Sequence, residues 1–240
     1  MTATRAEVCV SACADLFTGA GEVLASPMGV VPTLGARLAR LTTAPDLLLS
    51  DGEATLLATT PPLGGEVVPE GWLPFRQVFD VVAHGRRHVV MGANQLDRHG
   101  NQNISCIGPH ERPARQLLGV RGAPGNTVNH RTSYWVPRHS TRVFVPAVDL
   151  VSGVGTNRDA GPHHDLHRVV TNLAVLDFGG PDGTARLLSV HPGVTVEEVQ
   201  ANTGFPLHTD EVTETRPPTE QERALLAHLD PRSLRDREVP

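Results

Sequence analysis

Apolar and polar positions predict helices and buried strands in turn along the chain. Apolar side chains recur at helical spacing over residues 4–17, and helices are also expected over residues 32–42 and 73–84. Three consecutive leucines at residues 47–49 form a continuous apolar run. Such a run is typical of a parallel strand that is covered on both faces. A Pro/Gly-rich stretch over residues 59–72 is expected to be a surface excursion.

The later part of the chain carries strand candidates and two helix starts. Strands are expected from residue 88 and over residues 116–120, 142–145 and 169–178. Thr195 with Glu198, and Thr219 with Glu222, match the spacing of a capping box, so a helix is expected to begin at each threonine. A glycine ends the first of these helices and a proline ends the second.

This alternation of helices and buried strands predicts an α/β fold, with an open, mostly parallel sheet and helices on both faces. The length of 240 residues suits one domain with its own core, which we expect over residues 4–205. Residues 206–240 would add a C-terminal helix and a charged tail, SLRDREVP, that could dock on a partner.

Five uncharged amides follow the predicted strand at residue 88. They are Asn94, Gln95, Asn101, Gln102 and Asn103. Amides donate and accept hydrogen bonds without carrying charge, so this cluster suits a site that orients a polar, neutral ligand such as a thioester or a ketone. The alternative is a polar hairpin, because Asn and Gly also dominate turns.

A glycine-rich segment supplies a second candidate site. Gly122 and Gly125 flank an Ala-Pro pair, with Arg121 before them and Asn126 after them. Glycine lets backbone N–H groups approach an anion or a developing oxyanion, and the arginine adds a positive fork that could grip a carboxylate or stabilise an enolate. A plain turn with a surface arginine is the alternative. Ligands bind at the carboxyl ends of strands in open α/β sheets, so we expect residues 50–53, 92–95 and 121–126 to line one pocket.

Composition excludes several classes of function. The net charge of −5 offers no basic field for a nucleic acid, and the absence of lysine excludes a Schiff base or a phosphate-loop lysine. No apolar run is long enough to span a membrane, and no export signal is evident at the N-terminus, so a cytoplasmic protein is expected. Cys9, Cys13 and Cys106 suggest buried thiols rather than disulfides or metal ligands. His163, His164 and His167 are expected to lie in a solvated loop.

Three sequence blocks carry a family resemblance. They are HVVMGANQLDRHGNQN from residue 88, GVRGAPGNTVNH from residue 119, and HRVVTNLAVLDF from residue 167 followed by HPGVTVEEVQANTGF from residue 191. In this order they resemble the β subunit of class I coenzyme A transferases. The resemblance implies the coenzyme A transferase fold, and a glutamate nucleophile at the end of an early strand, where it forms a glutamyl thioester.

The chain departs from that family at the nucleophile. Alignment of LLLSDGEA places Ser50 or Asp51 where the glutamate is expected, and Glu53 follows two or three residues later. A shift of that size moves a side chain by several ångströms, since an extended residue spans about 3.3 Å. A misplacement of about 1 Å already slows catalysis steeply. Acyl-glutamyl chemistry is therefore not expected.

A nearer resemblance covers almost the whole chain. The stretches LARLTTAPDLLLSDGEA, EGWLPFRQVFD, RGAPGNTVNHRTSYWV and SLRDRE look like the β subunit of the coenzyme A-dependent ring-opening hydrolases of actinobacterial steroid degradation. That branch implies retro-Claisen hydrolysis of a C–C bond in a steroid-derived coenzyme A thioester. It also implies an α subunit that supplies the base, an α2β2 assembly, and no metal or further cofactor.

This resemblance assigns roles to several residues. The expected catalytic residues are Arg121, Glu53 and Asp51, and the expected substrate-binding residues are Ser50, Asn94, Gln95, Gly122, Gly125, Asn126, Asn129 and Arg131. Tyr134 could line the pocket, but packing in the core or at an interface is favoured for Tyr134 and Trp135. The alternatives are a transferase whose glutamate is misaligned, a non-catalytic partner subunit, and a ligand-sensing domain, which would also need a DNA-binding region.

Overall fold

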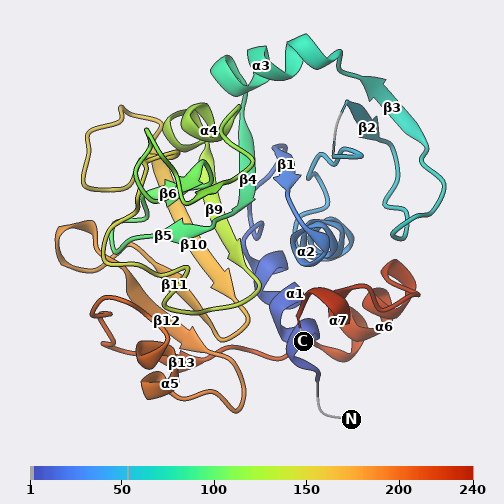
Figure 1. Cartoon of the computed structure of the whole chain (residues 1–240). Helices are drawn as coiled ribbons and strands as arrows, with labels where there is room; N and C mark the ends of the chain where they lie inside the picture. Colours follow the sequence, from blue (N-terminus) through green and yellow to red (C-terminus); the bar gives the residue numbers. More distant parts are fainter. Residues whose placement is uncertain (1–2, 53, 240) are drawn as a thin grey trace.

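The chain folds around a seven-stranded mixed sheet, seen in Figure 1. The computed structural model describes residues 3–52 and 54–239. In spatial order the sheet contains β1 (Leu24–Pro27), β4 (Arg87–Gly92), β9 (Arg131–Val136), β10 (Asp165–Thr171), β11 (Ala174–Asp177), β12 (Arg186–Val190) and β13 (Thr213–Glu214). Four of the six neighbouring pairs are parallel, and the pairs β10–β11 and β11–β12 are antiparallel. The predicted mostly parallel α/β sheet is confirmed.

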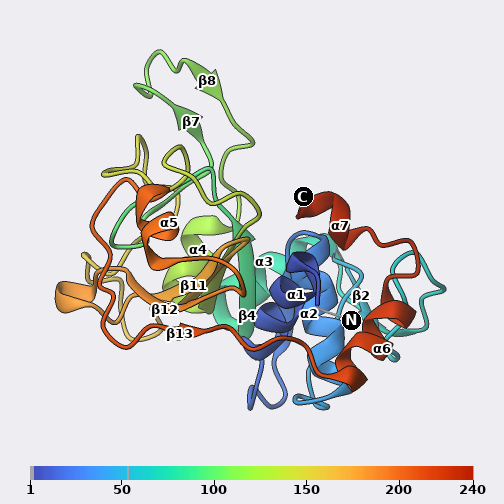
Figure 2. The ribbon, with the colours of Figure 1, turned by 90° about the horizontal axis from the view of Figure 1, so that it is seen from below.

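Helices and three short ribbons complete the fold. The helices are α1 (Arg5–Asp15), α2 (Val30–Leu41), α3 (Phe75–His84), α4 (Ala123–Asn129), the 3-10 turn η1 (Pro181–Gly183), α5 (Val196–Ala201), α6 (Glu220–Leu229) and α7 (Arg235–Glu238). The ribbons pair β2 (Thr55–Leu57) with β3 (Pro69–Trp72), β5 (Gln95–Leu96) with β6 (Gln102–Asn103), and β7 (Cys106–Ile107) with β8 (Arg115–Gln116). Figure 2 shows the β7–β8 ribbon standing away from the body of the molecule.

Both faces of the sheet are covered, so its central strands are buried on two sides. Along β4, Val90 packs into the core that contains α1 and α2, whereas Val89 and Met91 pack into the opposite core with residues of α4 and β12. Successive side chains of a strand point to opposite faces. A strand between two cores is therefore apolar at consecutive positions, as β4 is.

The helices α1 and α2 pack closely against each other. A Cβ atom added at Gly35 in α2 would lie 2.6 Å from the Cβ atom of Cys13 in α1. Cys9 and Cys13 are both fully buried, as expected for small apolar side chains, and burial raises the pKa of the Cys9 thiol to about 12. Gly35 therefore allows the two helices to approach more closely than any other residue would.

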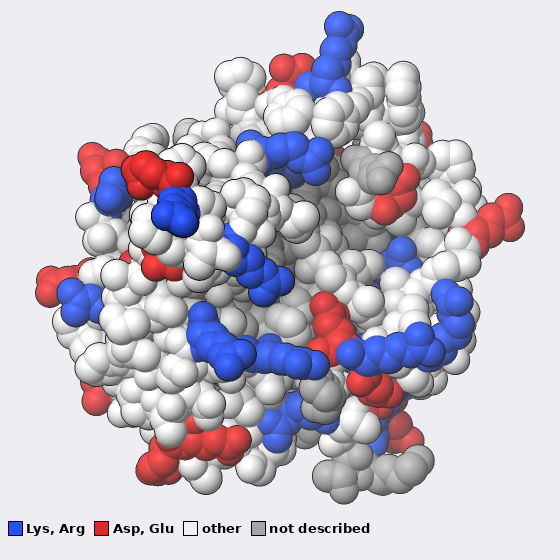
Figure 3. Space-filling model, in the orientation of Figure 1, with Lys and Arg blue, Asp and Glu red and all other residues white. Residues whose placement is uncertain are grey.

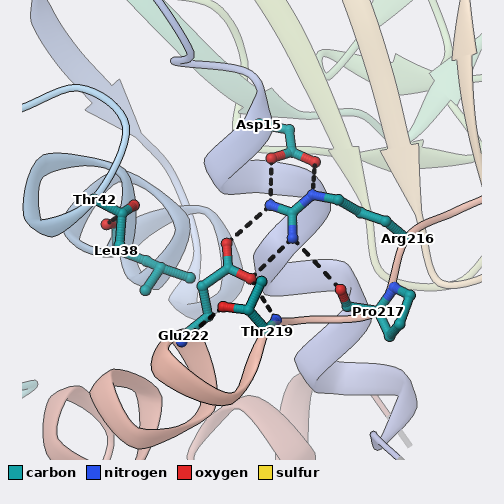
Figure 4. A network of polar contacts seen from close by, with 7 residues as sticks. All are labelled: Asp15, Leu38, Thr42, Arg216, Pro217, Thr219 and Glu222. Carbon is teal, nitrogen blue, oxygen red and sulfur yellow. Dashed lines mark hydrogen bonds and ion pairs between the residues drawn. The ribbon is translucent and has the colours of Figure 1, made fainter.

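An arginine ties the C-terminal region to α1. The guanidinium group of Arg216 donates to both carboxylate oxygens of Asp15, at 2.6 and 3.0 Å, and to both of Glu222, at 2.9 Å (Figure 4). Glu222 also completes the predicted capping box with Thr219 at the start of α6. These contacts join α6 to α1.

The charged tail packs in part on its own chain, while Ser233, Asp236 and Arg237 are exposed, and its docking on a partner stays a prediction. The carboxylate of Glu238 accepts hydrogen bonds from the backbone N–H of Val31 at 2.7 Å and from the indole N–H of Trp135 at 3.1 Å. Arg235 is mostly buried and pairs with Asp230 at 3.1 Å. The tail therefore belongs to the core that α1 and α2 form.

Four strand predictions need correction. Residues 169–178 form the end of β10 and all of β11, because Thr171 turns the chain by accepting from the N–H groups of Leu173 and Ala174. Only residue 116 of the segment 116–120 is in a strand, in the projecting ribbon. Residues 142–145 contribute a single bridge, from Phe144 to Leu96, and residues 47–49 contribute one parallel bridge to β1. No helix in the described ranges is long and apolar enough to cross a membrane.

Candidate active site

A cavity of about 420 Å³ lies at the carboxyl end of β1. Leu48 bridges Leu24 in parallel, so the segment that ends at Ser50 runs beside β1 and both finish at this cavity. The start of α4 and one side of α3 close it. Figure 3 shows that this face of the molecule is hollowed near its centre and that arginine side chains lie around the hollow. A site at the carboxyl ends of strands is the position that the fold favours.

One wall of the cavity is apolar and comes mainly from α3. Phe75, Val78, Phe79 and Val82 all line it, and their spacing places them on one side of the helix. None of the residues of α3 is buried, and Phe75 is 66% exposed. The helix therefore presents its apolar side to the cavity instead of to a core.

The polar part of the cavity lining is centred on Arg87. Its guanidinium group donates to the hydroxyl of Ser26 at 3.3 Å and to the amide oxygen of Asn126. Arg87 is only 9% exposed, and burial lowers its pKa to about 10, so it keeps its positive charge at neutral pH. Within residues 3–52 and 54–239, no carboxylate pairs with it. Arg87 was not among the residues predicted from the sequence.

The segment at residues 50–53 reaches the cavity in part. Ser50 lines it, together with Gly52. Asp51 is exposed, and its carboxylate accepts from the backbone N–H of Thr55 at 3.1 Å, so part of its hydrogen-bonding capacity stabilises the local turn. Glu53 lies outside the described residues, and its predicted catalytic role stays a prediction.

The glycine-rich segment also reaches the cavity, but as a helix start rather than an open loop. Arg121, Gly122 and Asn126 line the cavity, and Gly122 is the N-cap of α4. The side chain of Arg121 is exposed and has no ion pair among the described residues, so its positive charge is available at the rim. Gly125 serves packing, since a Cβ atom there would lie 2.7 Å from Val82 of α3.

The amide cluster lies outside this cavity. Gln95 is buried, where it donates to Asp149 at 3.0 Å and accepts from Asn103 at 2.7 Å. Gln102 donates to the carbonyl oxygen of Gly92 at 2.6 Å. Asn94 is exposed and does not line the cavity. These bonds hold residues 92–103 and Asp149 together within the protein, which corresponds to the polar-hairpin alternative.

Two other predicted residues line a second cavity, of about 720 Å³, at the amino ends of β4, β9 and β10. Asn129 there donates to the carbonyl oxygen of Val82 at 3.1 Å, and Arg131 pairs with Asp165 at 2.8 Å. Tyr134 and Trp135 are buried in the two cores, as the packing interpretation predicted. The structure therefore brings Ser50, Arg121, Gly122 and Asn126 together, and it places Asn94, Gln95, Asn129 and Arg131 elsewhere.

Five histidines have pKa values far below the ordinary range, chiefly because burial disfavours the charged ring. The pKa is about 3 for His88 and His139 and about 4 for His130, His167 and His191. The nearby positive charge of Arg87 further lowers the pKa of His130. All five rings are therefore neutral at physiological pH. No cluster of His, Cys, Asp or Glu side chains in the described part of the chain could hold a metal ion.

Known proteins share this fold over its whole length. The chain is 61% identical to the "cholesterol ring-cleaving hydrolase IpdB subunit" of Rhodococcus jostii RHA1, over 98% of this chain and 96% of that protein. The crystal structure of R. jostii RHA1 IpdAB superposes with a TM-score of 0.97, at 60% identity and full coverage of both chains.

A more distant relative is one of the subunits of the 3-oxoadipate CoA-transferase of Pseudomonas knackmussii, at 30% identity over 85% of each chain. No protein-family model matches the chain. The two sequence relatives nevertheless cover most of its length, and the predicted coenzyme A transferase fold is confirmed. The chain therefore belongs to the coenzyme A transferase-like family, in the branch formed by the IpdB subunits of cholesterol ring-cleaving hydrolases.

Proposed function

We propose that this chain is the β subunit of a heteromeric hydrolase that opens a ring of a steroid-derived coenzyme A thioester. The observation that carries the proposal is the cavity at the end of β1, which has an apolar wall and two arginines, Arg87 and Arg121. None of the described residues that line it is a carboxylate. Such a cavity suits a hydrophobic ring system on which negative charge develops. The named activity of the Rhodococcus relative supports the same reaction class.

The reaction we propose is a retro-Claisen cleavage. Water adds to a ring ketone, and the tetrahedral intermediate collapses with cleavage of the adjacent C–C bond. The former carbonyl carbon becomes a carboxylic acid. The carbon released from it becomes part of an enolate, which takes up a proton. Both the intermediate and the enolate carry negative charge on oxygen, and a nearby guanidinium group stabilises such charge. We assign this role to Arg121, whose charge lies at the rim without a counterion among the described residues.

The base that activates water is proposed to come from an α subunit, in an α2β2 assembly. The described lining of the cavity holds no Asp or Glu, whereas removing a proton from water needs a base within hydrogen-bond reach. The scheme uses no metal ion or redox cofactor, and coenzyme A is part of the substrate. The three free cysteines fit a cytoplasmic location, where thiols stay reduced.

Co-expression with a neighbouring α subunit provides the test. The purified complex is expected to open the ring of a bicyclic coenzyme A thioester and to place one oxygen-18 atom from labelled water in the new carboxylate. Acyl exchange between two acids, together with borohydride trapping of a glutamyl thioester on this chain, would establish the transferase alternative instead. Turnover that persists after Ser50→Ala, Arg87→Gln, Arg121→Ala and Asn126→Ala are combined would show that this subunit is a structural partner only.

A further inference from the structure

Arg87 carries a buried positive charge that the described part of the protein does not neutralise. Ser26 and Asn126 accept from two of the five N–H groups of its guanidinium, and Nε has no hydrogen-bond acceptor. The described residues offer it no ion pair. Both acceptors are neutral, so they hold the side chain in place without balancing its charge.

Burying an unbalanced charge is costly. The effective penalty for taking an ion out of water is several kcal/mol, and proteins usually offset it with a carboxylate partner. His130 is a titrating group that responds to Arg87, and it stays neutral. A buried cation that lines a cavity and lacks a counterion among the described residues is therefore poised to bind an anion that enters from outside.

The shape of the cavity limits what that anion can be. Arg87 lines the cavity together with Ser26 and Asn126, and much of the remaining lining consists of aliphatic and aromatic side chains of the β2–β3 region and α3. They are Leu56, Leu73, Phe75, Val78, Phe79 and Val82. A ligand that fits both parts has an apolar body with one charged end. A planar guanidinium group with spare N–H donors matches the two oxygens of a carboxylate better than it matches a neutral carbonyl group.

We propose that Arg87, held by Ser26 and Asn126, is a binding site for a carboxylate group on an otherwise apolar, alicyclic ligand. This inference rests on the proposed function and deepens it, because it assigns to Arg87 the binding of a carboxylate group of the ring-opening substrate or of its product. Arg121, at the exposed rim, remains the group that faces the reacting oxygen. The two arginines thus have separate tasks, binding by Arg87 and charge stabilisation by Arg121.

Two small probes that differ only in charge test the proposal on the co-expressed heteromer. Cyclohexanecarboxylate and cyclohexanecarboxamide are titrated into the complex, and their dissociation constants are measured by ligand-observed NMR. The wild type is expected to bind the carboxylate at least about 10-fold more tightly than the amide, as a charge-assisted pair should. Arg87→Gln should remove that preference and leave amide binding within about 3-fold. Arg37→Gln is the matched control, because Arg37 is also partly buried and donates to a backbone carbonyl, but lies on α2 away from the cavity.

Asn126→Asp provides a second variant, in which a side chain of the same size and shape replaces the amide. It keeps a hydrogen-bond acceptor for Arg87 but adds an internal counterion, so it should also abolish the preference for the carboxylate. Equal binding of both probes by the wild type, or an unchanged preference in Asn126→Asp, would overturn the site. If the complex opens rings but gives either of these two binding results, only this inference is refuted. A complex that prefers the carboxylate but opens no ring refutes the proposed reaction instead.

Discussion

Replacement of Gly35 by alanine should destabilise the protein, although alanine is the better helix former. Gly35 lies inside α2, where Gly→Ala normally stabilises a helix by about 1 kcal/mol. Here the new Cβ atom would lie 2.6 Å from the Cβ atom of Cys13 and 2.9 Å from its carbonyl carbon. The backbone of α1 cannot rotate away as a side chain can, so the two helices must separate. Overpacking of this kind typically costs about 1–3 kcal/mol.

The overpacking cost of about 1–3 kcal/mol exceeds or equals the helix-propensity gain of about 1 kcal/mol, so the net effect for Gly35→Ala is a loss of up to about 2 kcal/mol of unfolding free energy. For a domain of this size, 1 kcal/mol corresponds to a shift of about 2–4 °C in Tm, which calorimetry of the purified complex can measure. Gly92→Ala is the matched control, since a Cβ atom there meets no atom within 4 Å. Cys13→Gly should recover part of the loss in the double variant. A Tm for Gly35→Ala at or above that of Gly92→Ala would refute the reasoning.

Three further outcomes are expected. Arg216→Gln should lower the free energy of unfolding by about 1 kcal/mol near pH 7, because it removes the hydrogen bonds that lower the pKa of Glu222; this value allows for solvent screening of the half-exposed guanidinium. In denaturant titrations, the difference in unfolding free energy between the variant and the wild type should shrink below about pH 4, because the carboxylate of Glu222 becomes protonated there. Gly100→Ala should lower Tm by several degrees, because Gly100 has a φ of +76° and a Cβ atom there would lie 2.5 Å from the ring of Phe178. Arg121→Ala should reduce kcat of the ring-opening reaction by about 10²-fold without a comparable loss of stability, and near-normal kcat would remove this arginine from the mechanism.

Local sequence signals predicted the helices well and several strands poorly. The start of α6 was readable because Thr219 and Glu222 bond each other's backbone, an interaction set within four residues. The β10–β11 hairpin was not, because the apolar end of β10 and the apolar start of β11 are separated by only three residues, in which the hydroxyl of Thr171 forms the turn. Pro124 near the start of α4 was a signal for a helix in the glycine-rich segment, since proline is favoured in a first turn.

The site could be predicted only in part, because polar residues serve the backbone as often as a ligand. Gln95 and Gln102 look like binding residues in the sequence, yet their amides support a buried turn. Arg87 was missed, although strand alternation contains the signal. It shares a face with Val89 and Met91, so an inward-pointing cation could have been inferred from the strand pattern alone. The absence of a counterion among the described residues, by contrast, depends on distant segments and needed the structure.

The neutral histidines simplify the interpretation of future kinetics. In the folded protein, none of these five rings gains or loses a proton between pH 5 and 8, because their pKa values lie at about 3 to 4. An inflection in that interval of a pH–rate profile must therefore report another ionisation, in the second polypeptide, in the bound thioester, or at a solvent-facing group. Between about pH 6.5 and pH 4 the same rings take up protons only when the chain unfolds, so the free energy of unfolding falls steadily as the pH falls through this interval. Acid should therefore also inactivate the enzyme by cooperative unfolding, in addition to any graded loss of rate that those other ionisations cause.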